Sequence, residues 1–215
     1  MVAYTDTQIT VWLRGLLAIA WADGDFSTAE RATIIEVTKT ELDLQLDLTH
    51  LDPISTDELA ASFGHNSQIG QNFLRTAMMV AVADGIYSPP EAALLRAFHQ
   101  ALNVDTQVLT ALESTLISDT TLAEGVTNNQ KLDVLLPVRE WLDGLEIQDP
   151  RLARLLCKFI PSQCPFERDI TLFGHKIVHI PPLCKLNPLY DQTVGLRFRA
   201  LSYLADECGE DVLPY

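Results

Sequence analysis

The stretch AWADGDFSTAE at residues 20–30 decides how this chain folds, because it returns in register as AVADGIYSPPE at residues 81–91. Every shared position is offset by 61 residues, and the similarity extends upstream over the apolar residues before each copy. A duplication of this length indicates a repeated structural unit. In both copies an apolar helical pattern ends at an Asp-Gly turn, and the pattern Ser-x-x-Glu then opens a second helix. The sequence therefore predicts two similar helical hairpins in the N-terminal part.

Further helices are indicated around this repeat by apolar spacing and by helix-start residues. They are expected at 55–64, 105–117, 128–144, 149–159 and 193–207, with Pro137 kinking or restarting the third helix of this set. Two β-prone runs at 170–173 and 176–180 flank Gly174-His175, which favours a short hairpin. We expect a mainly all-α protein with a pseudo-twofold helical bundle at 1–125 and a small appendage of hairpin and helices at 126–215.

Charge is distributed unevenly over the 215 residues. Residues 1–148 contain 7 basic and 21 acidic residues, whereas residues 149–215 contain 8 of each, so the first part carries the whole net charge of −14. An acidic body argues against nucleic-acid binding, which needs a surplus of Lys and Arg on one face. Residues 149–205 alone carry a local excess of four positive charges. This basic segment either docks on the acidic body or meets a protein partner or an anionic membrane surface.

The sequence shows no signal for a membrane-spanning helix or for a signal peptide. No apolar run approaches the roughly 18 residues that a spanning helix needs, and the first residues lack the basic region of a signal peptide. We therefore expect a cytoplasmic protein that is not transmembrane. The apolar, proline-rich segment 180–190 is a candidate contact for a protein partner or, peripherally, for a membrane; it is equally interpretable as a strap folded over the helices.

The doubled Ala-Asp-Gly turn followed by Ser-x-x-Glu resembles the TerB-like family over about residues 7–117. That resemblance implies all-α helices paired around a pseudo-twofold axis. It also implies a role in metal-linked sensing or in scaffolding at membranes, in a family linked by name to tellurite resistance.

Residues 135–212 resemble a second family, named for the C-terminal domain of Mo-dependent nitrogenase and largely cyanobacterial. The similarity lies in CPFER at 164–168, IPPLCKLNPLY at 180–190 and LRFRAL at 196–201. The resemblance implies no nitrogenase activity for this chain, because a nitrogenase subunit needs cluster ligands within a much larger α/β protein.

Four acidic residues at equivalent places in the repeat form the first candidate site: Asp23, Glu30, Asp84 and Glu91. If a pseudo-twofold axis brings both turns together, their carboxylates offer the oxygen ligands that Ca²⁺, Mg²⁺ or Mn²⁺ prefer. The alternative is structural, because Asp before Gly is a common turn residue and Ser-x-x-Glu is a capping box.

A second candidate site lies in the tail, where Cys164, His175, His179 and Cys184 form a Cys₂His₂ set for zinc. The same cysteines are also interpretable as a redox-responsive Cys164/Cys184 pair or as buried free thiols, and the last interpretation suits Cys157 and Cys208 as well. Since no catalytic motif is present, we expect a non-catalytic binding, sensing or scaffold protein. The alternatives are a metal-dependent enzyme using the four carboxylates and a thiol redox sensor.

Overall fold

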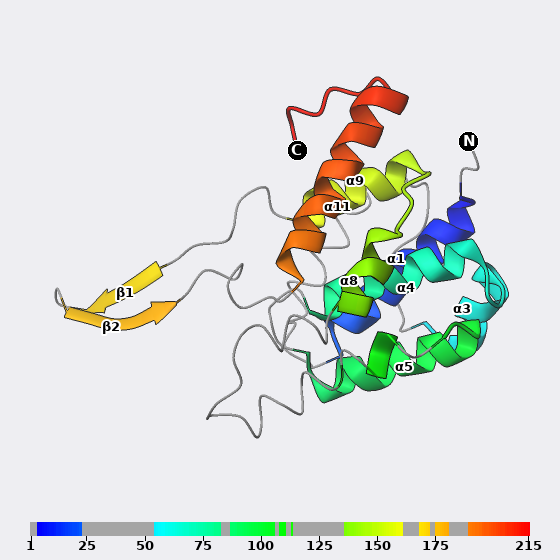
Figure 1. The fold of residues 1–215 in the computed structure, drawn as a ribbon, viewed down its shortest axis with the longest axis horizontal. Helices are drawn as coiled ribbons and strands as arrows, with labels where there is room; N and C mark the ends of the chain where they lie inside the picture. Colours follow the sequence, from blue (N-terminus) through cyan, green and yellow to red (C-terminus); the bar gives the residue numbers. More distant parts are fainter. Residues whose placement is uncertain are drawn as a thin grey trace.

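The protein is described from a computed structural model, which defines residues 4–22, 54–82, 87–105, 108–110, 113, 136–160, 168–172, 175–180 and 189–215. In residues 168–172 and 175–180 the description covers the backbone. The defined residues are mainly helical, in agreement with the all-α prediction (Figure 1). None of their helices is long and apolar enough to cross a membrane.

Four helices form the N-terminal bundle: α1 (Asp6–Ala20), α3 (Thr56–Phe63), α4 (Gln68–Ala81) and α5 (Pro89–Leu102). Their starts follow the sequence signals, since Thr5, Ser55, Ser67 and Ser88 each accept a hydrogen bond from an amide in the first turn. Helix α1 packs on α4, and α3 packs on α5. Helices α4 and α5 correspond to the second predicted hairpin, whereas the partner of α1 in the first hairpin lies outside the described residues.

Aromatic side chains fill the centre of this bundle. Trp12 of α1 contacts Phe63 and Phe73 edge to face, with ring centroids 5.8 and 5.9 Å apart. Gly15 permits this approach, because a Cβ atom there would lie 2.6 Å from the Phe73 ring. The Trp12 Nε1 atom donates to Thr76 Oγ1 at 2.9 Å, so the buried indole also has its polar partner. The equivalent positions 12 and 73 of the repeat thus meet in one core.

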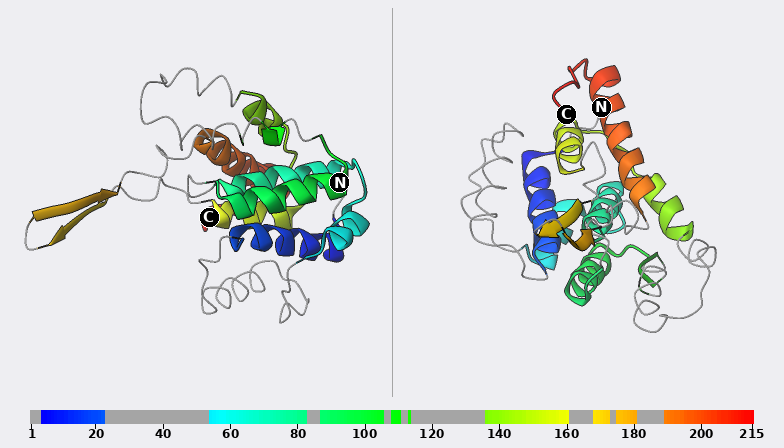
Figure 2. Two further views of the ribbon diagram at one scale, coloured as in Figure 1. Left: turned by 90° about the horizontal axis from the view of Figure 1, so that it is seen from below. Right: turned by 90° about the vertical axis from the view of Figure 1, so that its left-hand side faces the viewer.

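The C-terminal segment contributes α8 (Leu136–Asp143), α9 (Pro150–Phe159) and α11 (Tyr190–Ser202), which continues as a π-helical turn, η1 (Tyr203–Glu207). Helix α11 packs on both α9 and α8, and the views in Figures 1 and 2 place this group beside the N-terminal bundle. Leu142, Leu152 and Leu196 join the same hydrophobic core as the N-terminal helices. The two expected domains therefore share one core in the described part of the chain.

Between α9 and α11 lie the antiparallel strands β1 (Arg168–Leu172) and β2 (His175–Ile180). Their register pairs Arg168 with Ile180 and Leu172 with His175, with an irregularity after Ile170. His175, which the sequence placed in the turn, is thus the first residue of β2. The second strand therefore begins one residue earlier than the sequence predicted, because His175 pairs directly with Leu172.

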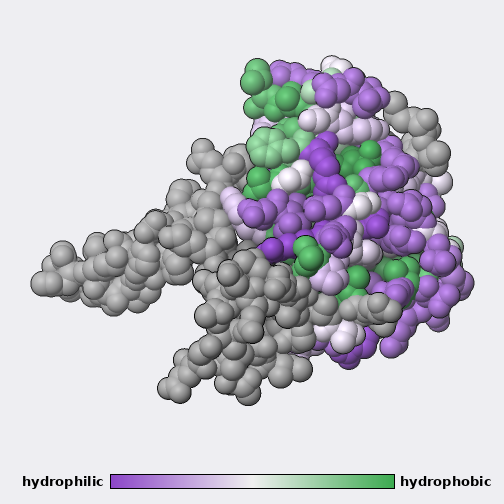
Figure 3. Space-filling view, viewed as in Figure 1, coloured by the Kyte–Doolittle hydropathy of each residue, from purple (hydrophilic) through white to green (hydrophobic). Residues whose placement is uncertain are grey.

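The face of the helical body shown in Figure 3 is largely polar. In Figure 3 hydrophobic atoms are interspersed among hydrophilic ones and gather near the end of the chain, beside α11. The strongly exposed large hydrophobic residues in the described ranges are Leu136, Phe198 and Leu213.

Candidate functional site

Most of the side chains expected to bind metal lie outside the described residues. This holds for Asp23, Glu30, Asp84, Cys164 and Cys184. His175 and His179 are placed by their backbone in β2, where they pair with Leu172 and Asp169. Within the described ranges no cluster of three or more His, Cys, Asp or Glu side chains is arranged to hold a metal ion. Both metal sites therefore stay predictions.

Glu91 is the one acidic repeat residue that falls within the described part, and there it forms the expected capping box. Its Oε2 atom accepts from the Ser88 amide at 2.8 Å and from Ser88 Oγ at 2.6 Å. The Ser88 hydroxyl oxygen in turn accepts from the Glu91 amide at 3.4 Å. Pro89 and Pro90 occupy the first helical positions. This geometry is that of the structural alternative, in which Glu91 stabilises the start of α5.

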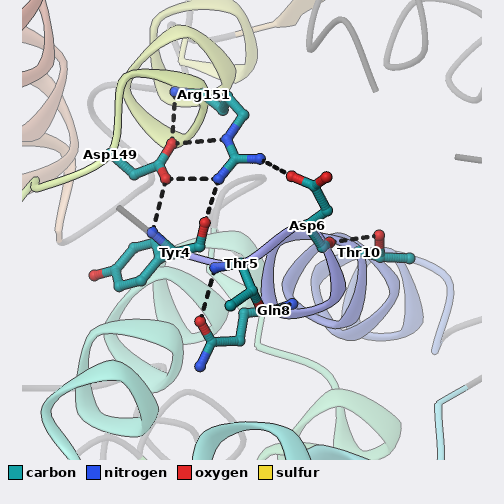
Figure 4. A network of polar contacts seen from close by, with 7 residues as sticks. All are labelled: Tyr4, Thr5, Asp6, Gln8, Thr10, Asp149 and Arg151. Carbon is teal, nitrogen blue, oxygen red and sulfur yellow. Dashed lines mark hydrogen bonds and ion pairs between the residues drawn. The ribbon is translucent and has the colours of Figure 1, made fainter. Parts of the chain in front are cut away.

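The most strongly connected polar group centres on Asp149, which is fully buried at the start of α9. Its carboxylate accepts from the Arg151 amide at 2.8 Å, from Arg151 Nε and Nη2 at 3.1 and 2.9 Å, and from the Tyr4 amide at 3.0 Å. Arg151 also donates to the Tyr4 carbonyl and pairs with Asp6 at the start of α1 (Figure 4). This group ties the beginning of the chain to α9.

The charge of Asp149 is stabilised by these contacts. Burial by itself raises the pKa of a carboxyl group, but the hydrogen bonds from Arg151 and Tyr4 and the guanidinium charge together lower the pKa of Asp149 below its ordinary value. The same pair raises the pKa of Arg151. Asp149 therefore remains ionised in the core and acts as a fixed anchor.

A second set of polar contacts joins α4 to the end of α8 and to the residues that follow it. Arg75 Nε donates to the Trp141 carbonyl at 2.8 Å, and its Nη1 donates to Asn72 Oδ1 at 2.9 Å. Asn72 Nδ2 reaches the Glu146 carbonyl at 3.2 Å. The Arg75 guanidinium also lies 5.3 Å from the centre of the Trp141 ring. We call both sets together the polar interface: Tyr4, Asp6, Asn72 and Arg75 on one side, and Trp141, Glu146, Asp149 and Arg151 on the other.

Other arginines of the tail likewise make internal contacts. Arg154 pairs with Glu210. Arg197 is buried and donates to the backbone oxygens of Cys157, Ile160 and Tyr215. Arg199 donates to the carbonyls of Asp143 and Leu145. With Arg151, four of the eight basic residues in the segment 149–205 make internal contacts. Of these four, Arg151 and Arg199 contact residues before 149, as the docking interpretation expects, whereas Arg154 and Arg197 contact residues within the tail.

His99 is a buried imidazole that sequence reasoning did not single out. Its side chain is fully buried, and its ring centre lies 5.9 Å from that of Trp141. Burial lowers its pKa from 6.5 to about 4, so the ring is neutral at pH 7.

Both described cysteines are free thiols. Cys157 is buried in α9, in agreement with its expected role as a small apolar side chain, and burial raises the pKa of its thiol. Cys208 follows η1 and is only partly buried, although it packs against the hydrophobic core, so it fits the interpretation as a buried thiol in part. The reason is its position at the end of the helix, beyond the last buried residue, Leu204.

Comparison with protein families gives one match. Residues 134–215, a little over a third of the chain, match the model of the family described as "Mo-dependent nitrogenase C-terminus". No curated protein and no solved structure matches significantly. The match confirms the resemblance of the C-terminal part, whereas the TerB-like resemblance of the N-terminal part stays a prediction. The segment from α8 to the chain end, which carries Trp141, Asp149 and Arg151, is therefore similar to this family.

Proposed function

We propose that the chain is a non-catalytic binding or scaffold protein whose N-terminal bundle and C-terminal family segment act as one body. The observation that carries the proposal is the polar interface. Its charged residues are the buried Asp149 and Arg75 and the partly buried Arg151, and their hydrogen bonds join segments far apart in the sequence. These hydrogen bonds fix the position of the C-terminal family segment relative to the N-terminal bundle. A binding surface built from residues of both segments requires such a fixed arrangement.

A TerB-like pair of hairpins is part of this proposal. The capping box at Ser88 and Glu91 supports the second copy, because the same pattern stands at Ser27 and Glu30 in the first. The proposal also includes a divalent cation at the repeat turns as a regulator of the bundle. It places the protein in the cytoplasm, where free thiols such as those of Cys157 and Cys208 are the rule.

The test is the assembly state of the full-length, tagged chain purified from the cells that express it. We expect elution in an assembly larger than the 23.9 kDa chain, with a second protein at a fixed ratio. Arg151→Ala, which loosens the polar interface, should release that protein. Arg96→Ala is the matched control, because Arg96 pairs with Glu113 at an exposed position away from the polar interface.

Elution of the chain alone, with no partner at a fixed ratio, would contradict the scaffold proposal. An assembly that survives Arg151→Ala unchanged would show that the partner does not depend on the joined body, and this part of the proposal would then be wrong.

A further inference from the structure

Two arginines from different helices meet at the turn that follows α8. Arg75 of α4 donates through Nε to the Trp141 carbonyl at 2.8 Å. Arg199 of α11 donates through Nη1 to the carbonyls of Asp143 and Leu145, at 2.7 and 3.2 Å. Carbonyl groups at the end of a helix attract cations, which explains why the guanidinium groups gather there. Two positive charges are thereby fixed at one short turn.

Neither charge is neutralised by a direct ion pair with a carboxylate of the described residues. The negative charge of Glu146 acts on Arg75, but the Glu146 carboxylate accepts its hydrogen bond from Gln148 Nε2 at 2.8 Å. Burial lowers the pKa of Arg75, and the positive charge of Arg199 lowers it further. The two guanidinium groups therefore repel each other in a partly desolvated place, which a bound anion would relieve.

Several donors of this arginine pair are unused in the described part of the chain. A guanidinium has five N–H donors. Arg75 uses Nε and Nη1, and Arg199 uses Nη1, which leaves Arg75 Nη2 and the Nε and Nη2 atoms of Arg199 without a hydrogen bond to any described residue. These are the donors that form bidentate contacts with carboxylates and phosphates.

Gly144 gives access to the buried member of the pair. Arg75 is 8% exposed as a whole, but its Nη2 atom lies next to the exposed Gly144. A Cβ atom on Gly144 would stand 3.0 Å from Arg75 Nη2 and 3.3 Å from the Trp141 carbonyl. Any residue other than glycine would therefore cover this donor, and the missing side chain leaves room for a small ligand atom.

We propose that Arg75 and Arg199 form a binding site for an oxyanion, a phosphate or carboxylate group, at the turn 141–146. In this site Arg75 Nη2 donates to the oxyanion beneath Gly144, and Arg199 donates to it through Nε and Nη2 from the solvent side. Glu146 is the internal competitor, since its carboxylate acts on the same charge when the site is empty. The site goes beyond the scaffold role proposed above, and it adds an anionic ligand that bridges the N-terminal bundle and the C-terminal segment.

The test is ligand binding by the full-length protein, measured by calorimetry and by thermal melting at pH 7 and constant ionic strength. Inorganic phosphate tests whether the site binds a phosphate group, succinate tests whether it binds a carboxylate group, and chloride serves as the reference salt. We expect saturable binding of at least one of the first two, and a tenfold difference in affinity between them identifies the source of the oxyanion.

The variants distinguish binding at this site from nonspecific electrostatic attraction of the anion. Gly144→Ala should weaken binding at least tenfold although both arginines remain, and Glu146→Gln should strengthen it several-fold. Gly195→Ala is the matched control on α11, because a Cβ atom there meets nothing within 4 Å. Urea unfolding of each variant establishes that it is folded before binding is measured.

Absence of saturable binding to both probes in the unmodified protein would overturn the proposal. Binding that Gly144→Ala and Arg199→Gln leave unchanged would overturn it as well, because the ion would then be held elsewhere.

Discussion

Asp149→Ala removes the central acceptor of the polar interface, and the structure allows its effect on stability to be worked out. Loss of the N-cap of α9 costs about 1 kcal/mol. Breaking a buried ion pair from one side costs about 3–5 kcal/mol. Because the Arg151 side chain is 18% exposed and keeps its contacts with Asp6 and the Tyr4 carbonyl, the lower end applies. We expect a total loss of about 4 kcal/mol in the free energy of unfolding.

The assay is equilibrium unfolding in urea at pH 7, followed by circular dichroism. With a slope of about 3 kcal/mol per molar urea, the midpoint should fall by about 1 M. Asp149→Asn separates the two contributions, since asparagine caps helices as well as aspartate but carries no charge. Glu58→Ala, which removes an exposed partner of Arg14, should cost less than about 1 kcal/mol.

Acidification offers an independent check on the same residue. The folded pKa of Asp149 lies below its unfolded value, so its contribution is present above the unfolded pKa and is lost as pH falls through the folded pKa. Asp149→Asn should therefore flatten the decline of stability in acid. A loss below 1 kcal/mol in Asp149→Ala, with an unchanged acid profile, would refute this reasoning.

Three further predictions follow from other groups. The folded pKa of His99, about 4, lies below its unfolded value, so stability should fall as pH drops from about 6.5 to 4, and His99→Phe should remove this dependence in urea unfolding. Alkylation at pH 8 with peptide mass spectrometry should modify Cys208 well before Cys157, whose thiol is buried and has a raised pKa. A divalent cation at the repeat turns should stabilise the protein by about 2.7 kcal/mol at one hundred times its dissociation constant, and Asp23→Ala with Asp84→Ala should abolish that gain in melting scans.

Each of these has a control or a contrary outcome. His65 is exposed, so His65→Phe should leave the acid dependence in place. Equal alkylation rates for the two thiols would show that α9 opens readily. A cation effect that persists in the double aspartate variant would locate the ion away from the repeat turns.

Local signals in the sequence predicted local structure well. Ser88 and Asp149 cap helices as their patterns indicate, because a cap needs only residues within three positions of each other. The family resemblance of the tail was also visible, since it rests on contiguous motifs.

The polar interface was not predictable in the same way. Arg75 and the Trp141 carbonyl are 66 residues apart, and Tyr4 and Asp149 are 145 apart. Their contacts depend on how α4 lies against α8 and how the residues before α1 lie against the start of α9, and no periodicity encodes that. The local surplus of positive charge in the tail was compatible both with docking on the body and with binding to a partner or a membrane surface. Only the packing shows Arg197 and Arg199 directed at backbone carbonyls.

Hydrogen exchange of the full-length protein and of Asp149→Ala, read by mass spectrometry, tests most directly whether the two segments form one unit. We expect amides of α4 and α9 in the unmodified protein to exchange through one common opening. In Asp149→Ala both helices should then lose protection by the same amount. Loss of protection in α9 with α4 unchanged would contradict this, because the family segment would then be a separate folding unit resting on the N-terminal bundle.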